Sequence, residues 1–424
     1  MKKDIDLNTL YSCSPWAIWR HVRTESLGFW FVCGYLFFEY VRPQTIYPQL
    51  DVFPWTQALI ILSLFWALIV DRNIKPSGNG LNKLLIIYGI VVIISSAFAI
   101  WPSIAFENPD VYFNWLIIYF AIVLTVNTRK RFFIFMLLYL LCNFKMSQHG
   151  FLSWAKRGFS FAAWGVTGAP GWFRNSGEFG IELTIYTPMV LTFILALKPQ
   201  WNKLVKIIFY LMPITAIGST VATSSRGALI GLIAAMLWLL KASKYLIRTI
   251  FALVIIGSLT YWFIPDQFIA RFETAGEDRT SLHRLNMWED AWNTILQNPF
   301  FGVGHKNWEV YFRSNPDFEQ RGSAMTHNIF LQSGTEHGLI GMFTLIMIFI
   351  FMFILNSRTR KYANEHEMRF EYFMSYGMDA AIVGMIISAS FVTVLYYPYV
   401  WIHAALVACL YNTSCRPGLQ NGQH

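Results

Sequence analysis

The chain has 424 residues, of which 55% are hydrophobic and only 13% are charged. Soluble chains carry about 25% charged residues, so this composition excludes an ordinary soluble globular protein. A net charge of +9 is also found in nucleic-acid-binding proteins, but here the basic residues alternate with apolar runs. That distribution indicates a membrane protein with no nucleic-acid partner. The five cysteines show neither a disulfide framework nor metal-ligand spacing.

Apolar runs that approach the length of a membrane span recur along the whole chain. About 20 apolar residues cross the hydrocarbon layer as a helix. The N-terminal segment lacks the compact apolar core of a cleaved signal peptide. The sequence therefore predicts an all-α integral membrane protein with about twelve transmembrane helices, at residues 27–41, 55–71, 84–101, 112–127, 132–148, 179–197, 204–222, 227–241, 249–264, 328–355, 374–395 and 400–411.

The positions of Lys and Arg predict how these spans are oriented, because basic residues gather in short cytoplasmic loops. With the N-terminus inside, the inner segments hold 21 of the 33 basic residues, and every short inner loop carries at least three. We therefore expect both termini in the cytoplasm and two long connections, 149–178 and 265–327, on the outer face.

This topology divides the chain into three regions. We expect nine membrane helices in 1–264, an outer loop with amphipathic helices in 265–327, and three membrane helices with a cytoplasmic C-terminus in 328–424. Long loops are usually functional or disordered. This one is rich in Arg and Trp, so we expect it to fold against the membrane face.

The first polar element on the outer face is "GAPGWFRNSGEFGIELTIYTP", residues 168–188. Asn175 and Glu178 have the spacing of a helix capping pair. Arg174, Glu178 and Glu182 recur every four residues, so in a helix they would share one stripe. Ionisable groups at membrane depth are candidates for function. The alternative for Glu178 and Glu182 is a structural Arg–Glu pair that anchors the helix. Arg174 is the stronger functional candidate because it lies at the outer end of this element.

The second element is "TSSRGALIG", residues 223–231, the whole outer turn between two predicted spans. Ser and Gly suit the geometry of a turn, but a turn does not require Arg226. An arginine that merely reaches the interface is the alternative reading.

The third element, residues 281–308, predicts an amphipathic helix followed by a tight turn. The helix ends at Asn298-Pro299, and its apolar face consists of Leu285, Trp288, Trp292 and Ile295. Arg284 lies at the edge of that face and can point toward the membrane core; a plain surface arginine is the alternative. The glycines at 302 and 304 form a turn that is not a P-loop, because no Lys-Ser/Thr follows.

The fourth element, residues 324–355, carries two histidines where a long apolar run begins. His327 lies near the outer surface and has the working pKa range that suits proton transfer. In a continuous helix His337 would lie about 15 Å deeper, so the two imidazoles cannot serve one small reacting centre. We expect His337 and Glu336 to pack against neighbouring spans. The alternative for His327 is a structural role. Three arginines on the same predicted outer face make this alternative less favoured.

Arg174, Arg226 and Arg284 together favour an anionic headgroup, most naturally a diphosphate, because the guanidinium fork binds phosphate bidentately. No nucleotide is available outside the cytoplasm, so a bond-forming reaction there needs a substrate that arrives activated. A sugar linked through diphosphate to a polyprenyl lipid meets that condition. His327 would take the proton from an acceptor hydroxyl that attacks the anomeric carbon, while the arginines stabilise the leaving diphosphate.

These elements resemble those of the O-antigen ligase and polymerase superfamily of bacterial envelope proteins. The family pattern of His, a small or amide residue, nine positions, Gly, two positions and a small residue is met by His327, Asn328, Gly338 and Gly341. "SSRGALIGL" and "RLNMWEDAWNTILQNPFFGVGHKNW" match its Ser-Arg-Gly turn and its Arg…Trp…Asn-Pro-x-x-Gly-x-Gly segment. The resemblance spans residues 170–345, and "FFEYVRPQTIYP", 37–48, is similar to the ligase branch associated with exosortase clusters.

The resemblance implies a glycosyltransferase of the C type in the bacterial inner membrane, with its active site facing the periplasm. It would use an undecaprenyl-diphosphate-linked glycan, invert the anomeric centre, and need no metal or other cofactor. His327 and Arg284 would be catalytic, and the residues that bind the diphosphate or substrate would be Arg174, Arg226, Arg284 and Glu178. Asp317-Phe318-Glu319 contains a carboxylate pair that suits a metal, with solvated side chains as the alternative.

Three functions stay open at this point. The first is a ligase that joins the glycan to a hydroxyl of lipid A–core oligosaccharide. The second is a polymerase, or a ligase acting on protein hydroxyls, with the same donor. The third is a twelve-span transporter. In all three cases the protein is surrounded by membrane lipids. The first six spans are not duplicated in the last six, and the outer loop of 63 residues makes the chain lopsided, which favours an enzyme.

Overall fold

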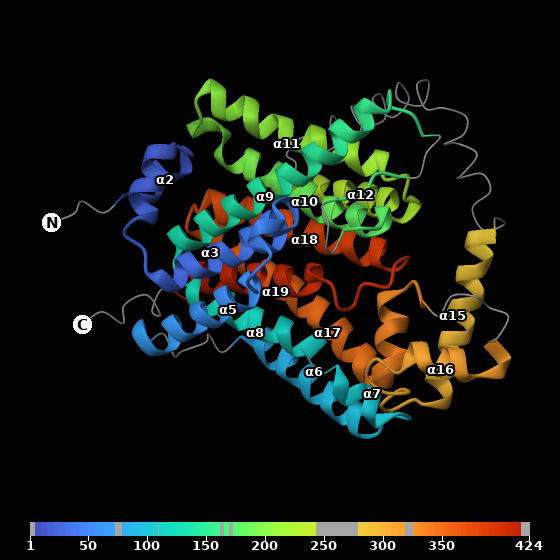
Figure 1. Cartoon of the computed structure of the whole chain (residues 1–424). Helices are drawn as coiled ribbons and strands as arrows, with labels where there is room; N and C mark the ends of the chain where they lie inside the picture. Colours follow the sequence, from blue (N-terminus) through green and yellow to red (C-terminus); the bar gives the residue numbers. More distant parts are fainter. Residues whose placement is uncertain are drawn as a thin grey trace.

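The computed structural model describes residues 5–72, 79–108, 110–161, 165–168, 173–242, 279–318 and 325–416, and the regular structure in these ranges is helical throughout. Figure 1 shows how the helices pack side by side in one bundle. In chain order they are α1 (Leu7–Tyr11), α2 (Pro15–Val22), α3 (Leu27–Tyr40), α4 (Pro43–Ile46), α5 (Trp55–Phe65), α6 (Gly80–Ala97), α7 (Pro102–Glu107), α8 (Asp110–Thr125), α9 (Arg129–Lys156), α10 (Ser176–Leu197), α11 (Lys203–Ala222), α12 (Arg226–Leu239), α15 (Arg279–Gln297), α16 (Trp308–Ser314), α17 (Ile329–Glu365), α18 (Arg369–Ala389) and α19 (Pro398–Cys415).

The predicted all-α membrane protein is confirmed in its broad form. Among the described residues, α6, α10, α11, α17 and α18 are long and apolar enough to cross a membrane. Eleven of the predicted spans coincide with a helix, and the predicted span 249–264 lies outside the described residues. The count of twelve spans and the C-type glycosyltransferase architecture remain predictions.

Helix α10 lies at the centre of the bundle, where it packs against α9, α11, α12 and α18. Its apolar window is 89% buried, as expected of a helix that is apolar on every side. Its neighbours α12 and α18 approach each other closely, since a side chain at Gly231 would meet the Gly384 carbonyl. The N-terminus of α10 is therefore held in place by helices on several sides.

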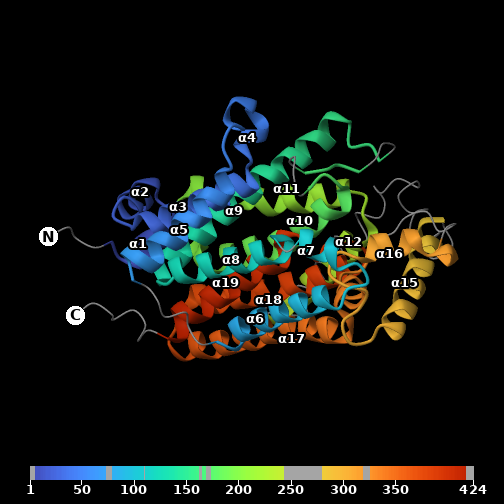
Figure 2. The same cartoon turned by 60° about the horizontal axis from the view of Figure 1, so that its bottom comes forward.

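The ends of the described chain lie together, opposite the helices within residues 279–318. In Figures 1 and 2, α2 and the end of α19 lie at one end of the bundle, whereas α7, α15 and α16 lie at the other. This arrangement agrees with the predicted topology, in which both termini share one side. Which side faces the cytoplasm remains a prediction.

Helix α15 forms where the amphipathic helix was predicted and ends directly before Asn298-Pro299, but its buried face is rotated. Leu285 and Trp292, predicted to be on the apolar face, are exposed. Ile295 of the predicted face is buried where α15 packs against α17, and a place for Leu285 and Trp292 at the membrane surface stays a prediction. The other buried residues of α15 are Met287, Asp290, Ala291 and Thr294.

Helix α17 covers the predicted span 328–355 but is kinked within it. Gly338 has φ of +68° and ψ of −171°, which interrupt the helical backbone. A left-handed φ is open to glycine and strained for residues with a Cβ. The glycine of the family pattern thus marks a break in the helix, which corrects the expectation of one continuous span.

The loop that follows α15 docks into this break. The Val303 N–H donates to the Thr335 carbonyl at 2.8 Å, and the Leu339 N–H donates to the Pro299 carbonyl at 2.7 Å. Gly302, with φ of +68°, and Gly338 let the two backbones approach so closely that a Cβ on either would meet the other segment. We call residues 298–304 together with 335–339 the loop–helix clasp.

Replacing Gly338 with Ala is expected to destabilise the protein far more than replacing Gly158. Both glycines have a left-handed φ, but a Cβ at Gly158 meets nothing within 4 Å, whereas one at Gly338 meets the Phe300 backbone. A left-handed residue with a Cβ costs about 1–2 kcal/mol, so Gly158→Ala reports that strain alone. Thermal unfolding should show the larger fall in Tm for Gly338→Ala; equal falls would contradict the clasp.

Candidate active site

A cavity of about 1180 Å³ lies between the helix ends near α15 and α16. Its wall combines parts of α3, α5 and α8 with the N-termini of α10 and α12, part of α15, the stretch before α17 with the first turns of that helix, and the segment 391–397. The residues predicted from the sequence that line it are Glu178, Arg226, Arg284 and His327. The fold therefore brings polar groups from four separate parts of the chain to one cavity.

The N-terminus of α10 presents Glu178 to the cavity. The predicted capping pair is confirmed: Asn175 Oδ1 accepts from the Gly177 N–H at 2.7 Å, and Glu178 Oε2 accepts from the Asn175 N–H at 3.2 Å. The other oxygen, Glu178 Oε1, accepts from the Tyr397 hydroxyl at 2.7 Å. Because both oxygens have donors, the carboxylate is held at the cavity wall by its own helix cap and by the segment before α19.

The turn between α11 and α12 presents Arg226, the first residue of α12. Ser224 adopts a left-handed φ of 53°, and the Ser225 side chain caps α12 by accepting from the Ala228 N–H. Arg226 Nη2 donates to Ser281 Oγ on α15 at 3.3 Å. The guanidinium therefore reaches from α12 across to α15 along the cavity wall.

Asn328 determines where His327 lies. The Asn328 side chain caps α17 by accepting from the N–H groups of Phe330 and Leu331 at 2.9 and 3.2 Å. His327 thus stands outside the helix, with a left-handed φ of 47°, and its N–H donates to Thr393 Oγ1 at 2.9 Å. Such backbone strain in a non-glycine residue is concentrated at functional sites. The amide that follows His in the family pattern serves here as the helix cap.

His327 is held in the neutral form by its surroundings. Burial lowers the pKa of its imidazole to about 4, and the positive charges of Arg284 and His283 add to this effect. The expectation of an ordinary working pKa is therefore wrong for the protein without substrate. The charges of Arg284 and of His283, which the sequence did not single out, therefore lie close enough to His327 to lower its pKa.

Two predicted residues stand apart from this group. Arg174 is exposed, lies before the cap of α10, and is not among the described residues that line the cavity. The predicted stripe of Arg174, Glu178 and Glu182 is wrong at its first member, because the helix begins only after Asn175. Glu182 is fully buried in the bundle, where its Oε1 accepts from the Tyr139 hydroxyl at 2.7 Å.

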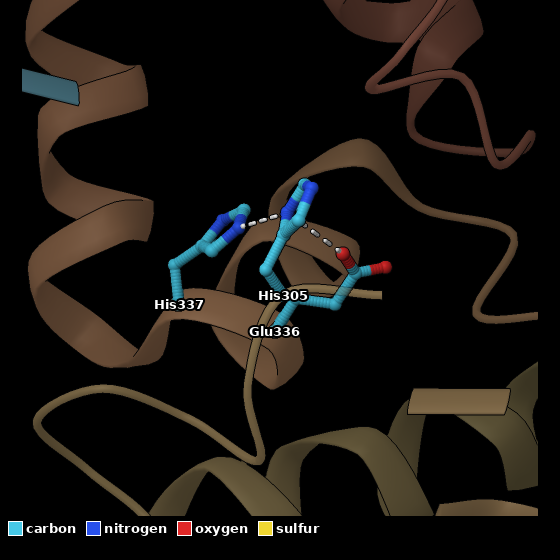
Figure 3. A group of neighbouring side chains, drawn as sticks. All are labelled: His305, Glu336 and His337. Atoms are coloured by element: carbon cyan, nitrogen blue, oxygen red, sulfur yellow. Dashed lines mark hydrogen bonds and ion pairs between the residues drawn. The ribbon is translucent and has the colours of Figure 1, made fainter. Parts of the chain in front are cut away.

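A buried cluster of His305, Glu336 and His337, shown in Figure 3, was only partly foreseen. His305 Nδ1 lies 3.1 Å from His337 Nε2 and 4.0 Å from Glu336 Oε2. Burial lowers the pKa of the His305 imidazole. The expected packing of His337 against a neighbouring span is confirmed, since its Nδ1 lies 3.2 Å from the Tyr88 hydroxyl on α6.

No sequence spacing relates His305 to Glu336, and only the clasp brings them together. Glu336 is further held by the Tyr396 hydroxyl, which donates to its carboxylate, and by the Lys306 N–H, which donates to Oε2 at 2.9 Å. Glu336, Lys306 and Tyr396 also line the cavity. The carboxylate pair suggested for a metal, at Asp317 and Glu319, lies outside the side chains that the structure describes.

Comparisons with known proteins agree with the sequence resemblance. Residues 207–346 match the family model described as O-Antigen ligase. The teichuronic acid biosynthesis protein TuaE of Bacillus subtilis is 24% identical over 263 residues, which cover 57% of this chain and 51% of TuaE. An uncharacterized protein of Haemophilus influenzae is 29% identical over 208 residues, which cover 43% of this chain and 51% of that protein. The chain spans about half the length of the curated relatives it matches.

The low pKa of His327 predicts how its reactivity depends on pH. An imidazole with the ordinary pKa of about 6.5 loses roughly tenfold of its neutral form between pH 7.5 and 5.5. With a pKa of about 4, His327 stays neutral over that interval, so its rate of modification by diethyl pyrocarbonate should be nearly constant. Mass spectrometry of the labelled protein measures that rate.

The variant Arg284→Gln removes one of the positive charges that lower the pKa, so its His327 should lose reactivity at a higher pH than in the wild type. A tenfold loss between pH 7.5 and 5.5 in the wild type, or an unchanged profile in the variant, would contradict the electrostatic account.

Proposed function

We propose, from the premise that the chain carries the O-antigen ligase domain in residues 207–346, that it is a glycosyltransferase of the bacterial inner membrane. It moves a glycan from undecaprenyl diphosphate to a hydroxyl of lipid A–core oligosaccharide at the periplasmic face, and it inverts the anomeric centre. The chain is similar to TuaE, whose name assigns that protein to teichuronic acid biosynthesis, and this similarity supports an enzyme that assembles polysaccharide.

The observation that carries the proposal is the meeting of Arg226, Arg284 and His327 in one cavity. These residues come from α12, α15 and the stretch before α17. The N-terminal residues of α10 and α12 line the same cavity, and the backbone N–H groups at helix N-termini attract anions. Two arginines and two helix N-termini form the environment that a diphosphate requires.

In the proposed reaction the donor diphosphate binds between Arg226 and Arg284, and its polyprenyl tail extends between helices. The acceptor hydroxyl gives its proton to the imidazole of His327 while its oxygen forms a bond to the anomeric carbon. The bond from that carbon to the diphosphate oxygen breaks, and the electron pair stays on the leaving polyprenyl diphosphate. The arginines stabilise the charge on this leaving group, and no metal takes part in the step.

The donor itself makes His327 a better base. In the structure without substrate, the positive charge of Arg284 helps to lower the pKa of the imidazole. A bound diphosphate compensates that charge and so raises the pKa, while the larger lowering caused by burial remains. The imidazole is thus a stronger base when the donor is in place, and water is less readily activated in its absence.

Two further residues have proposed contacts with substrate. Glu178 lines the cavity and is proposed to accept hydrogen bonds from glycan hydroxyls. Arg174 is exposed next to the cavity residue Asn175, and we propose it as an outer contact for the diphosphate as the donor enters. In this topology both termini are cytoplasmic and the cavity faces the periplasm.

The acceptor is the part of the proposal that the donor site does not determine. A polymerase that extends the growing glycan, or a ligase that modifies protein hydroxyls, would use the same donor and the same base. A transporter would not need His327 as a base. The experiment below therefore includes a separate reaction for each acceptor.

Replacing His327 with Ala is expected to lower glycan transfer by at least about 100-fold, because a positioned general base contributes roughly 10²–10⁴-fold. Donor binding should persist, because both arginines remain. The full chain is reconstituted in vesicles with undecaprenyl-diphosphate glycan and, in separate reactions, lipid A–core, a second lipid-linked glycan or a hydroxyl-bearing protein. His366→Ala, an exposed histidine that follows α17, is the control and should keep full activity.

Normal transfer by His327→Ala would contradict its assignment as the base. Transfer by the wild type to the lipid-linked glycan or the protein alone would select the corresponding alternative. If the wild type only moved the donor across the membrane, the enzyme proposal would fail.

Arg284→Lys is expected to weaken donor binding roughly tenfold, because a point charge replaces a fork that makes two charge-assisted hydrogen bonds. Equilibrium binding of a labelled polyprenyl-diphosphate glycan measures the loss. Arg358→Lys, at an exposed arginine near the other end of α17, controls for the change of side chain. Equal affinities of wild type and Arg284→Lys would rule out the diphosphate role of this arginine.

A further inference from the structure

The cluster beside the cavity places two imidazoles and a carboxylate around one point. The three ligand atoms, His305 Nδ1, His337 Nε2 and Glu336 Oε2, lie within 4.8 Å of one another. Figure 3 shows the three side chains turned toward each other from the loop after α15 and from α17. All three residues are buried, with His305 and His337 fully inaccessible. Ligand atoms of a tetrahedral zinc ion lie about 3.3 Å apart, so a small rotation of the carboxylate suffices.

The two imidazole nitrogens that point away from the centre of the cluster, His305 Nε2 and His337 Nδ1, have the hydrogen-bond partners that a metal site requires. His305 Nε2 lies 3.1 Å from the Asn108 carbonyl, which can only accept, so this nitrogen carries the proton and Nδ1 presents a lone pair. His337 Nδ1 faces the Tyr88 hydroxyl, which in turn lies 2.9 Å from Ser333 Oγ. With the His337 proton on Nδ1, its Nε2 lone pair faces that of His305. Metal-bound histidines donate their other N–H to a carbonyl or hydroxyl in this way.

The surrounding backbone fixes this arrangement. A Cβ at Gly304 would overlap Ala99, and one at Gly302 would overlap the carbonyl of Thr335. The loop that carries His305 is therefore packed closely against α17 and the segment that follows α6. A rigid set of ligands lowers the entropic cost of binding an ion.

The charge of the cluster also favours a cation. A carboxylate buried beside two imidazoles is costly unless it is paired or coordinates a metal. Glu336 accepts from the Tyr396 hydroxyl and the Lys306 N–H, neither of which is a formal charge. Among the described contacts of Glu336, the ion pair is the one with His305 at 4.0 Å, and it exists only if that imidazole is protonated.

We propose that His305, Glu336 and His337 bind a divalent transition-metal ion of the zinc type. Two imidazole nitrogens and one carboxylate oxygen suit such an ion, and the fourth position is open to the Tyr396 oxygen, 3.1 Å from His305 Nδ1, or to water. Glu336 and Tyr396 line the cavity, so the cavity is the route by which the ion enters.

The ion has a structural role. His305 and His337 do not line the cavity, and the transfer step proposed for His327 proceeds without it. The ion joins the loop after α15 to α17 at the loop–helix clasp, and so adds to the forces that hold Arg284 near His327. The site and the glycosyltransferase activity can therefore succeed or fail separately.

The full chain, with any affinity tag removed, is loaded with Zn²⁺ in detergent, exchanged into metal-free buffer, and analysed for metal by mass spectrometry. We expect about one ion per chain and a fall in Tm after chelation, because a bound ion stabilises the folded state. With Co²⁺ in place of Zn²⁺, we expect the visible absorption of a tetrahedral site.

Three variants should each lose at least about 90% of the bound metal, since a remaining ligand pair binds far more weakly: His305→Gln, Glu336→Gln and His337→Gln. His403→Gln is the matched control, because His403 is also buried but contacts the Met378 carbonyl between α19 and α18. It should retain the metal.

Absence of bound zinc and of a cobalt spectrum in the wild type would overturn the proposal. The two histidines would then be joined by a direct hydrogen bond, which His337 Nε2 donates to His305 Nδ1. Undiminished metal in all three ligand variants would also overturn it, because the ion would then lie elsewhere. The wild-type measurements decide the question even if a variant fails to fold.

Discussion

The docking of one backbone loop into the break in α17 is the constraint on which the candidate site depends. Two backbone hydrogen bonds, from Val303 to Thr335 and from Leu339 to Pro299, join the loop after α15 to the helix that follows His327. Gly338 permits this approach, since any Cβ there would meet the loop. Because α15 carries Arg284, the clasp sets the distance between the arginine and the histidine that the proposed reaction needs.

The electrostatics of the cavity follow from the same assembly. Burial and the charge of Arg284 keep His327 neutral, and a neutral imidazole beside guanidinium groups is ready for an anionic substrate. In the proposed complex a diphosphate pairs with the arginines and offsets their part in lowering the pKa of His327. In the proposed mechanism the donor binds first, and the acceptor hydroxyl is activated afterwards. The proposed metal centre stabilises the same clasp from its buried side.

Local signals in the sequence were sufficient for the parts of the site that depend on short-range geometry. The capping pair of Asn175 and Glu178 forms because its spacing brings each side chain to the other's backbone. Contacts between distant segments could not be predicted from the sequence, because nothing in the spacing of His305 indicates that it meets His337. The four-residue spacing predicted that Arg174 shares a helical face with Glu178, because spacing alone does not show whether a residue precedes or follows the N-cap of a helix. The buried face of α15 is likewise set by its partner helix, which hydropathy does not name.

The most direct test is a structure of the full chain in a lipid disc with a non-transferable polyprenyl-diphosphate glycan. The account predicts that the diphosphate lies between the guanidinium groups of Arg226 and Arg284, with the anomeric carbon on the side of His327. A diphosphate bound outside the cavity, or inside it but out of reach of both arginines, would contradict the account.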